Sequence, residues 1–153
     1  IINMPLKRNE FLKPISREHH HGLLLCFKIR TGIKKQIIPD RIKKYANWFY
    51  QNHLIPHFSI EEEILFPILG NENELVVKAI EEHRTIDRLF KNQESTIQNL
   101  NAIANAIENH IRFEERILFT ALQDIATENQ LQQIELHHTE SKFIENNEDV
   151  FWV

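Results

Sequence analysis

The sequence predicts an all-α protein: an up-down-up-down four-helix bundle with an additional short C-terminal helix. Apolar residues recur at spacings of three and four over four long segments, which is typical of amphipathic helices. Only three glycines and five prolines interrupt the 153 residues, so long helices fit better than many turn-linked strands. Short connections between the segments favour antiparallel neighbours, and the length fits one domain.

The first helix is expected to begin at Ser16, an N-cap residue, and to end near Thr31, where Gly32 would stop it. Residues 1–14 precede it as an N-terminal arm that ends in a proline.

The second helix is expected from Pro39 to about Leu69, with a kink at Pro56, because the apolar pattern resumes in phase beyond that proline. The third and fourth helices fit residues 74–91 and 95–124. The four-helix bundle then occupies residues 15–125. Because the second and fourth helices are two apart in this order, they should run in the same direction.

A fifth helix should begin at Thr127, where TENQ resembles a capping box, and continue to about Glu145. Residues 126–153 would therefore form a C-terminal helix and tail, with a possible protein partner bound through that helix.

Composition excludes several classes of function. The net charge of −4 and the lack of a lysine or arginine run predict no nucleic-acid and no membrane partner. No apolar stretch approaches the ~20 residues that span a bilayer, and no signal-peptide pattern opens the chain, so a cytoplasmic location is expected. Cys26 is the only cysteine, which excludes an internal disulfide and a thiolate-rich metal site.

One ten-residue motif occurs twice, as HFSIEEEILF at residues 57–66 and as HIRFEERILF at residues 110–119. In each copy, a histidine and a glutamate four residues apart lie within an apolar helical face. The two predicted faces are Tyr50, Leu54, His57, Glu61, Ile64, Ile68 and Ile103, Ile107, His110, Glu114, Ile117, Ala121.

Carboxylates buried on these faces would cost several kcal/mol each without a positive partner. No lysine or arginine falls on either face, so a metal ion is the simplest counter-charge. The histidine of each motif is placed to share that ion with its glutamate.

The first and third helices add one histidine each. The first contains Glu18, His20, Leu23 and Phe27, and the third repeats this spacing as Glu81, His83, Ile86 and Phe90. This match selects His20 over His19 and His21, and whether His19 joins the metal site stays open. Four imidazoles and two bridging carboxylates would hold two metal ions, and this donor set suits iron, manganese or zinc.

At these residues the chain resembles the hemerythrin-like, or HHE cation-binding, family over residues 15–125. The resemblance implies a non-haem centre of two iron ions, with zinc or manganese possible, inside a four-helix bundle. By position, its ligands would be His20, His57, Glu61, His83, His110 and Glu114.

The family resemblance further implies a protein that binds, senses or reduces a small diatomic or peroxide ligand such as dioxygen, nitric oxide or peroxide. Asp87 stands where oxygen-carrying hemerythrins have a second histidine, so reversible oxygen carriage is not expected. Asp87 could reach the metal or only accept a hydrogen bond.

Other functions stay open: a metal-responsive sensor or interaction module without turnover, iron storage, or iron-centre repair. A ferritin-like carboxylate site is disfavoured, because the two ExxH pairs, Glu18/His21 and Glu135/His138, do not lie on matching central helices.

Overall fold

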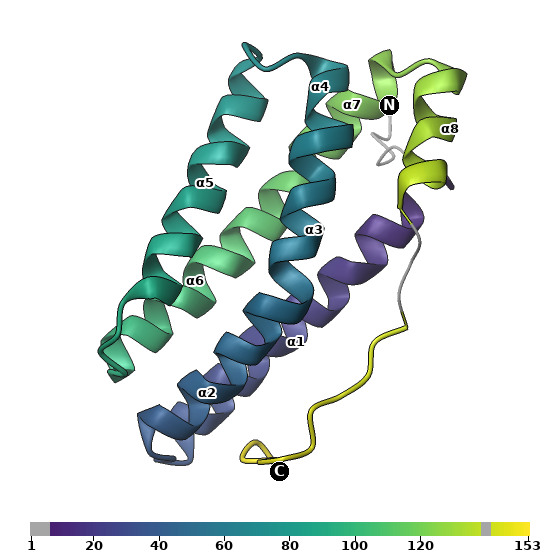
Figure 1. Ribbon diagram of the computed structural model, residues 1–153. Helices are drawn as coiled ribbons and strands as arrows, with labels where there is room; N and C mark the ends of the chain where they lie inside the picture. The colour runs from purple at the N-terminus through teal and green to yellow at the C-terminus, as the bar shows by residue number, and fades with distance from the viewer. Residues whose placement is uncertain (1–6, 139–141) are drawn as a thin grey trace, which may run out of the picture.

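The computed structural model describes residues 7–138 and 142–153, and over these residues it is helical with no strand (Figure 1). The first and third long helices are α1 (Lys13–Lys34) and α5 (Glu74–Lys91). The second and fourth are composite rods that include π-helical turns, labelled η. The second rod comprises α2 (Pro39–Phe49), η1 (Tyr50–Leu54), α3 (Ile55–Ile60), η2 (Glu61–Leu65) and α4 (Phe66–Leu69). The fourth comprises α6 (Ile97–Phe113), η3 (Glu114–Leu118) and α7 (Phe119–Ile125), and α8 (Glu128–His137) follows.

The four long elements alternate in direction, as predicted (Figure 1). The chain descends in α1, rises through α2 to α4, descends in α5 and rises again through α6 and α7. The second and fourth rods therefore run in the same direction, and this places the two copies of the repeated motif at the same height.

Side-chain caps explain where three helices begin. The side chain of Asn73 accepts a hydrogen bond from the backbone N–H of Leu75 at the start of α5, and that of Thr96 does the same for Asn99 in α6. The predicted capping box at Thr127 is present and starts α8.

The first helix is longer than the sequence predicted. It begins at Lys13 and continues through Gly32 to Lys34. A Cβ atom on Gly32 would lie 2.7 Å from Ile42 Cδ1 and 2.8 Å from Phe151 Cε1. Gly32 therefore serves close packing rather than a helix stop.

Two π-helical turns begin at the glutamates of the repeated motif, η2 at Glu61 and η3 at Glu114. A π turn contains an extra residue, so the buried face moves on by one position beyond each glutamate. The predicted faces are wrong there: Leu118 is fully buried and Ile117 is 50% exposed. In the second rod Leu65 is likewise buried in place of Ile64.

Pro56 lies at the start of α3, directly after the π-helical turn η1. Proline lacks a backbone N–H and its ring collides with the carbonyl four residues earlier in an α-helix. The wider π turn accommodates both effects, so the rod continues past Pro56.

Two apolar clusters lie along the bundle, one on each side of a buried polar layer. The cluster toward the α1–α2 turn includes Ile29, Phe49 and Ile103. The cluster toward α4 and α7 includes Leu65, Phe66 and Phe119. The polar layer between them contains the histidines and glutamates singled out from the sequence.

The C-terminal region differs from the prediction. The fifth helix ends at His137 rather than near Glu145, and residues 142–153 run back along the bundle beside α1 and α2 without helical structure (Figure 1). Glu145 accepts hydrogen bonds from Lys28 at 2.6 Å and from Tyr45 at 2.5 Å, and Phe151 is buried. These contacts hold the segment extended.

Residues 1–6, part of the predicted arm, lie outside the described residues. Leu12 is fully buried, and Arg8 donates a hydrogen bond to Gln123 at 3.0 Å, so this part of the arm packs on the bundle.

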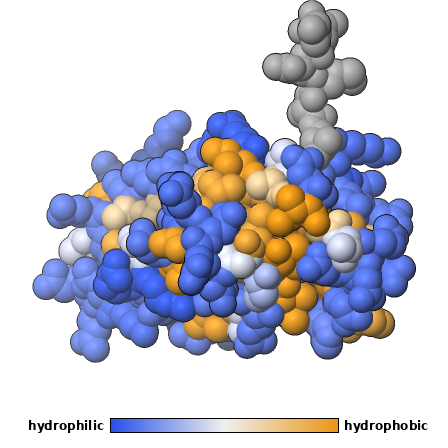
Figure 2. All heavy atoms as spheres, turned by 90° about the horizontal axis from the view of Figure 1, so that it is seen from above, coloured by the Kyte–Doolittle hydropathy of each residue, from blue (hydrophilic) through white to orange (hydrophobic). Residues whose placement is uncertain are grey.

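Figure 2 looks onto the end formed by α4, α7 and α8 and shows hydrophobic residues gathered between hydrophilic ones. Within the described ranges, the helices are too short or too polar to cross a membrane.

Candidate metal centre

The polar layer contains five of the six side chains predicted as ligands: His57, Glu61, His83, His110 and Glu114. The sixth, His20, is exposed and lies outside the cluster. Its neighbour His19 lies in the cluster instead, 5% exposed.

The shift of the inward histidine by one position, from His20 to His19, has a simple cause. One residue turns an α-helix by about 100°, so adjacent histidines point to different sides. The first helix reads Glu18-His19-His20 and the third reads Glu81-Glu82-His83, so two alignments of the pair are available. The alignment that agrees with the structure pairs Glu18-His19 with Glu82-His83.

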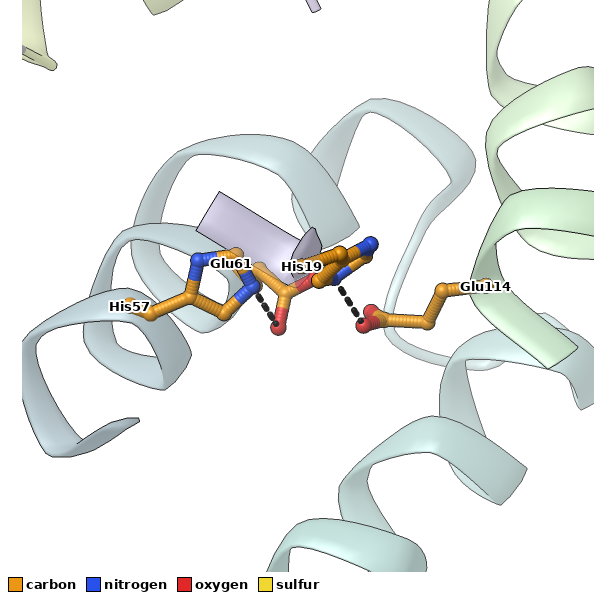
Figure 3. Close-up of side chains that lie close together, drawn as sticks. All are labelled: His19, His57, Glu61 and Glu114. Atoms are coloured by element: carbon orange, nitrogen blue, oxygen red, sulfur yellow. Dashed lines mark ion pairs between the residues drawn. The ribbon is translucent and has the colours of Figure 1, made fainter. Parts of the chain in front are cut away.

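The cluster divides into two groups of four that share both glutamates. One group is His19, His57, Glu61 and Glu114, and the other is Glu61, His83, His110 and Glu114. In each group the potential ligand atoms lie within 4.8 Å of one another. Figure 3 shows the first group, whose side chains converge from α1, α3, η2 and η3.

Each imidazole turns its Nε2 atom toward a glutamate. In the first group, His57 Nε2 lies 3.4 Å from Glu61 Oε1 and His19 Nε2 lies 3.2 Å from Glu114 Oε1, along the dashed lines of Figure 3. In the second group, the matching Nε2 distances are 3.2 Å from His83 to Glu61 Oε1 and 3.0 Å from His110 to Glu114 Oε1.

Many of these inward atoms have no hydrogen-bond partner among the described residues. They are both carboxylate oxygens of Glu61 and of Glu114, together with Nε2 of His19 and of His57. Both glutamates have no solvent exposure. Buried polar atoms are rarely left unpaired, because desolvation without a partner is costly. The donor set therefore fits cations held between the side chains.

A second layer of carboxylates faces the Nδ1 atoms of the same histidines. His57 Nδ1 lies 2.8 Å from Glu18, His83 Nδ1 2.7 Å from Glu62, and His110 Nδ1 2.8 Å from Glu82. His19 Nδ1 lies 3.6 Å from Glu115. An Nδ1–H that donates outward leaves the Nε2 lone pair pointing inward, which is the tautomer that binds metals.

The pKa values reflect strong coupling between the inner groups. Burial raises the pKa of Glu61 to about 8, and the Glu114 carboxylate adds to the rise. Burial acts against charge on His110, but Glu114 outweighs it and raises the pKa of His110 to about 10. Glu114 is buried, but the charge on His110 holds the pKa of the Glu114 carboxyl group well below its usual range. Protons here balance negative charge, and a divalent cation could replace them.

The outer glutamates stay ionised. Burial would raise the pKa of Glu18, but the neighbouring imidazoles of His138 and His57 hold it at about 2. A hydrogen bond from His83, opposed by burial, lowers the pKa of Glu62 to about 2.

Apolar rings enclose the centre. Phe58 stacks on His83 with ring centroids 3.9 Å apart, and Phe119 stacks on His19 at 5.4 Å. These rings fix the imidazole planes and keep water from that side.

Asp87 does not belong to either group. It accepts a hydrogen bond from the Tyr50 hydroxyl at 2.5 Å and forms an ion pair with Lys91 at 2.7 Å. The alternative of a hydrogen-bond acceptor therefore fits its position. Cys26 is a small buried residue, and burial raises the pKa of its thiol to about 12.

Sequence reasoning placed His20 in the centre, left His19 open, and missed the contacts of Glu18 and Glu82 with the histidines. The signal that could have found them is the Glu-His pair in α1 and α5, together with small residues at the buried positions that follow His19. Gly22 and Cys26 are buried three and seven residues after His19, whereas Phe27, seven after His20, is 60% exposed.

Comparison with known proteins gives one family match. The model of the Hemerythrin HHE cation binding domain matches residues 11–122. A protein of Nostoc sp. strain PCC 7120 named "DNA nickase" is 24% identical over 136 residues, which covers 83% of this chain and 38% of that protein. The chain thus spans less than half of that relative. No solved structure matches the chain.

Proposed function

Since the chain belongs to the Hemerythrin HHE cation binding domain family, we propose that it holds two iron ions and uses them to bind, sense or reduce a small ligand such as dioxygen, nitric oxide or peroxide. The observation that carries the proposal is that Glu61 and Glu114 belong to both groups of potential ligands. Two carboxylates shared in this way can bridge a metal pair. Zinc or manganese would suit the same donors.

In this proposal the ligands of one ion are His19 and His57, those of the other are His83 and His110, and both glutamates are shared. Bound iron would supply redox chemistry and an open coordination position. The chain's own part is to hold the imidazoles of His57, His83 and His110 in one tautomer through their outer carboxylates and to exclude bulk water with the phenylalanine rings.

The first experiment is metal content per chain, measured on protein purified without chelators, together with the visible absorption spectrum. Two irons per chain with charge-transfer bands are expected, and those bands should respond to dioxygen, nitric oxide or peroxide. A chain that takes up no metal and keeps a fully stable fold would overturn the proposal.

Metal removal supplies an independent readout. A ligand at a hundred times its Kd stabilises a fold by about 2.7 kcal/mol, which for a chain of this size corresponds to a Tm change of roughly 5–10 °C. Chelated protein should melt lower by about this amount. Zinc should restore the Tm without restoring the visible bands, which separates the structural effect of metal from its redox chemistry.

A second candidate is a metal-responsive interaction module without turnover. The observation that favours it is a direct link from the centre to the end of α8. Glu18 lies 2.8 Å from His57 Nδ1 and 3.4 Å from His138 Nε2. A change at His57 would reach α8, where Leu136 is 73% exposed and could contact a partner. The terminal VFWV segment fits this role less well, because Phe151 is buried.

DNA cleavage enters only through the name of the Nostoc relative. We propose no nucleic-acid partner, on the net charge of −4. Incubation of metal-loaded protein with supercoiled plasmid tests this, because appearance of the nicked form would contradict it. A cytoplasmic location is likewise a proposal, as are iron storage and iron-centre repair as alternative roles.

A further inference from the structure

A cavity of about 410 Å³ connects the surface to the polar layer. Its inner wall includes the imidazoles of His19, His57 and His110, and its outer part lies beside His21, His53 and Phe143. It passes between α1, the middle of the second rod and the C-terminal segment.

The cavity is far larger than a diatomic molecule requires. A dry cavity of about 150 Å³ already holds benzene, and pockets for organic ligands begin near 300 Å³. Much of the wall is apolar, with Leu54, Ile86 and Ile107 among its side chains. The space fits an elongated organic molecule.

Charge narrows the class of ligand. Among the wall residues that the structure describes there is no lysine or arginine, whereas Glu18 and Glu63 contribute carboxylates. An anionic head group would meet these carboxylates without a lysine or arginine to pair with, and the inner imidazoles already face glutamates. An uncharged molecule avoids this cost.

A polar atom of His21, outside the polar layer, is available as an anchor. His21 Nδ1 is buried and has no hydrogen-bond partner within the described part of the chain. The His21 ring stacks on Phe143 with centroids 4.3 Å apart, which fixes its position near the outer end. A hydroxyl or carbonyl oxygen of a ligand would satisfy this nitrogen.

We propose that the cavity binds an uncharged, mainly apolar organic molecule of roughly a dozen heavy atoms with a single hydroxyl or carbonyl group. Binding itself needs no metal. Only the claim that the inner end of the bound molecule would meet the metal ions rests on the proposed function.

The probes are straight-chain 1-alkanols from hexanol to dodecanol, measured by displacement of the neutral dye N-phenyl-1-naphthylamine from the full chain, with and without metal. Affinity should rise roughly fourfold per methylene until the cavity is filled and then level off. In the metal-free chain, carboxylates of equal chain length should bind at least tenfold more weakly. Absence of dye and alkanol binding, or tighter binding of the carboxylates, would overturn the proposal.

Two variants test whether the ligand binds in this cavity. Leu54→Trp fills the interior and Asn52→Trp obstructs the exposed rim, and each should weaken alkanol binding at least tenfold. Asn101→Trp, an exposed position on α6 away from the wall, is the matched control. If Leu54→Trp fails to fold, the Asn52→Trp variant still decides. Equal affinity in Asn52→Trp and the control would reject this cavity as the site.

The anchor is tested separately. His21→Ala should weaken alkanol binding roughly fivefold, the loss of about one hydrogen bond. The control is His20→Ala, because His20 is exposed and outside the wall. Equal losses in both variants would refute the anchor.

The outcomes also separate the two proposals. If metal binds and no alkanol does, the cavity inference fails and the metal centre stands. If alkanols bind and metal does not, the metal centre fails while the cavity inference stands.

Discussion

The choice between His19 and His20 can be decided by a pair of alanine variants. His19→Ala removes one imidazole from the group of His19, His57, Glu61 and Glu114 and leaves three ligands there. The other group of four keeps all its ligands. Metal content should therefore fall from two ions per chain to one, whereas His20→Ala should keep two.

The assay is metal analysis of protein equilibrated with a small excess of ferrous iron under anaerobic conditions and then desalted. In His19→Ala, the remaining metal ion should also be lost more readily on dilution, because the shared glutamates then have one metal ion beside them instead of two. His20 is exposed, so its loss should change neither metal content nor Tm. Full metal content in His19→Ala with reduced content in His20→Ala would refute the assignment.

Two further predictions address the outer carboxylates and the C-terminal segment. Glu82→Ala should weaken metal binding about 10- to 100-fold, because His110 loses the acceptor that orients it, while Glu81→Ala at the exposed neighbouring position should have no effect; equal affinities would contradict this role. Burial of the carboxyl group would raise the folded-state pKa of Glu145, but the hydrogen bond from Lys28 lowers this pKa below 4.5. The ionised Glu145 therefore stabilises the fold above pH 4.5, and this stabilisation is lost as the pH falls through the folded-state pKa. Stability curves of wild type and Glu145→Gln, followed by tryptophan fluorescence, should therefore differ near pH 7 and converge in acid, and a constant difference would argue against the ion pair.

Much of the fold could be predicted because the signals are local. The capping box at Thr127 fixes the start of α8, and the spacing of apolar residues gives α5 its predicted bounds, Glu74–Lys91. The five predicted side chains that the structure brings together lie where the apolar face is continuous or repeated.

The errors arise where tertiary contacts override local pattern. Gly32 looks like a helix stop, but Ile42 and Phe151 approach it closely inside a continuing helix. Residues beyond His137 could have continued α8, but Glu145 binds Lys28 and Tyr45 in an extended segment.

The π turns at Glu61 and Glu114 could not be seen from a 3.6-residue period. The extra residue in each turn leaves Leu118 buried where the period placed Ile117. The cavity was also missed, because it depends on how three distant segments leave space between them.

The sharing of Glu61 and Glu114 divides the molecule into two helical hairpins. Residues 13–69 supply His19, His57 and Glu61, and residues 74–125 supply the matching histidines and Glu114. Each hairpin thus carries two imidazoles and one carboxylate, and each carboxylate would also serve the ion proposed for the opposite hairpin. Metal ions bound at this position would join two similar halves of the molecule. Removal of the metal should therefore weaken the contacts between the two hairpins before it weakens the contacts within either hairpin.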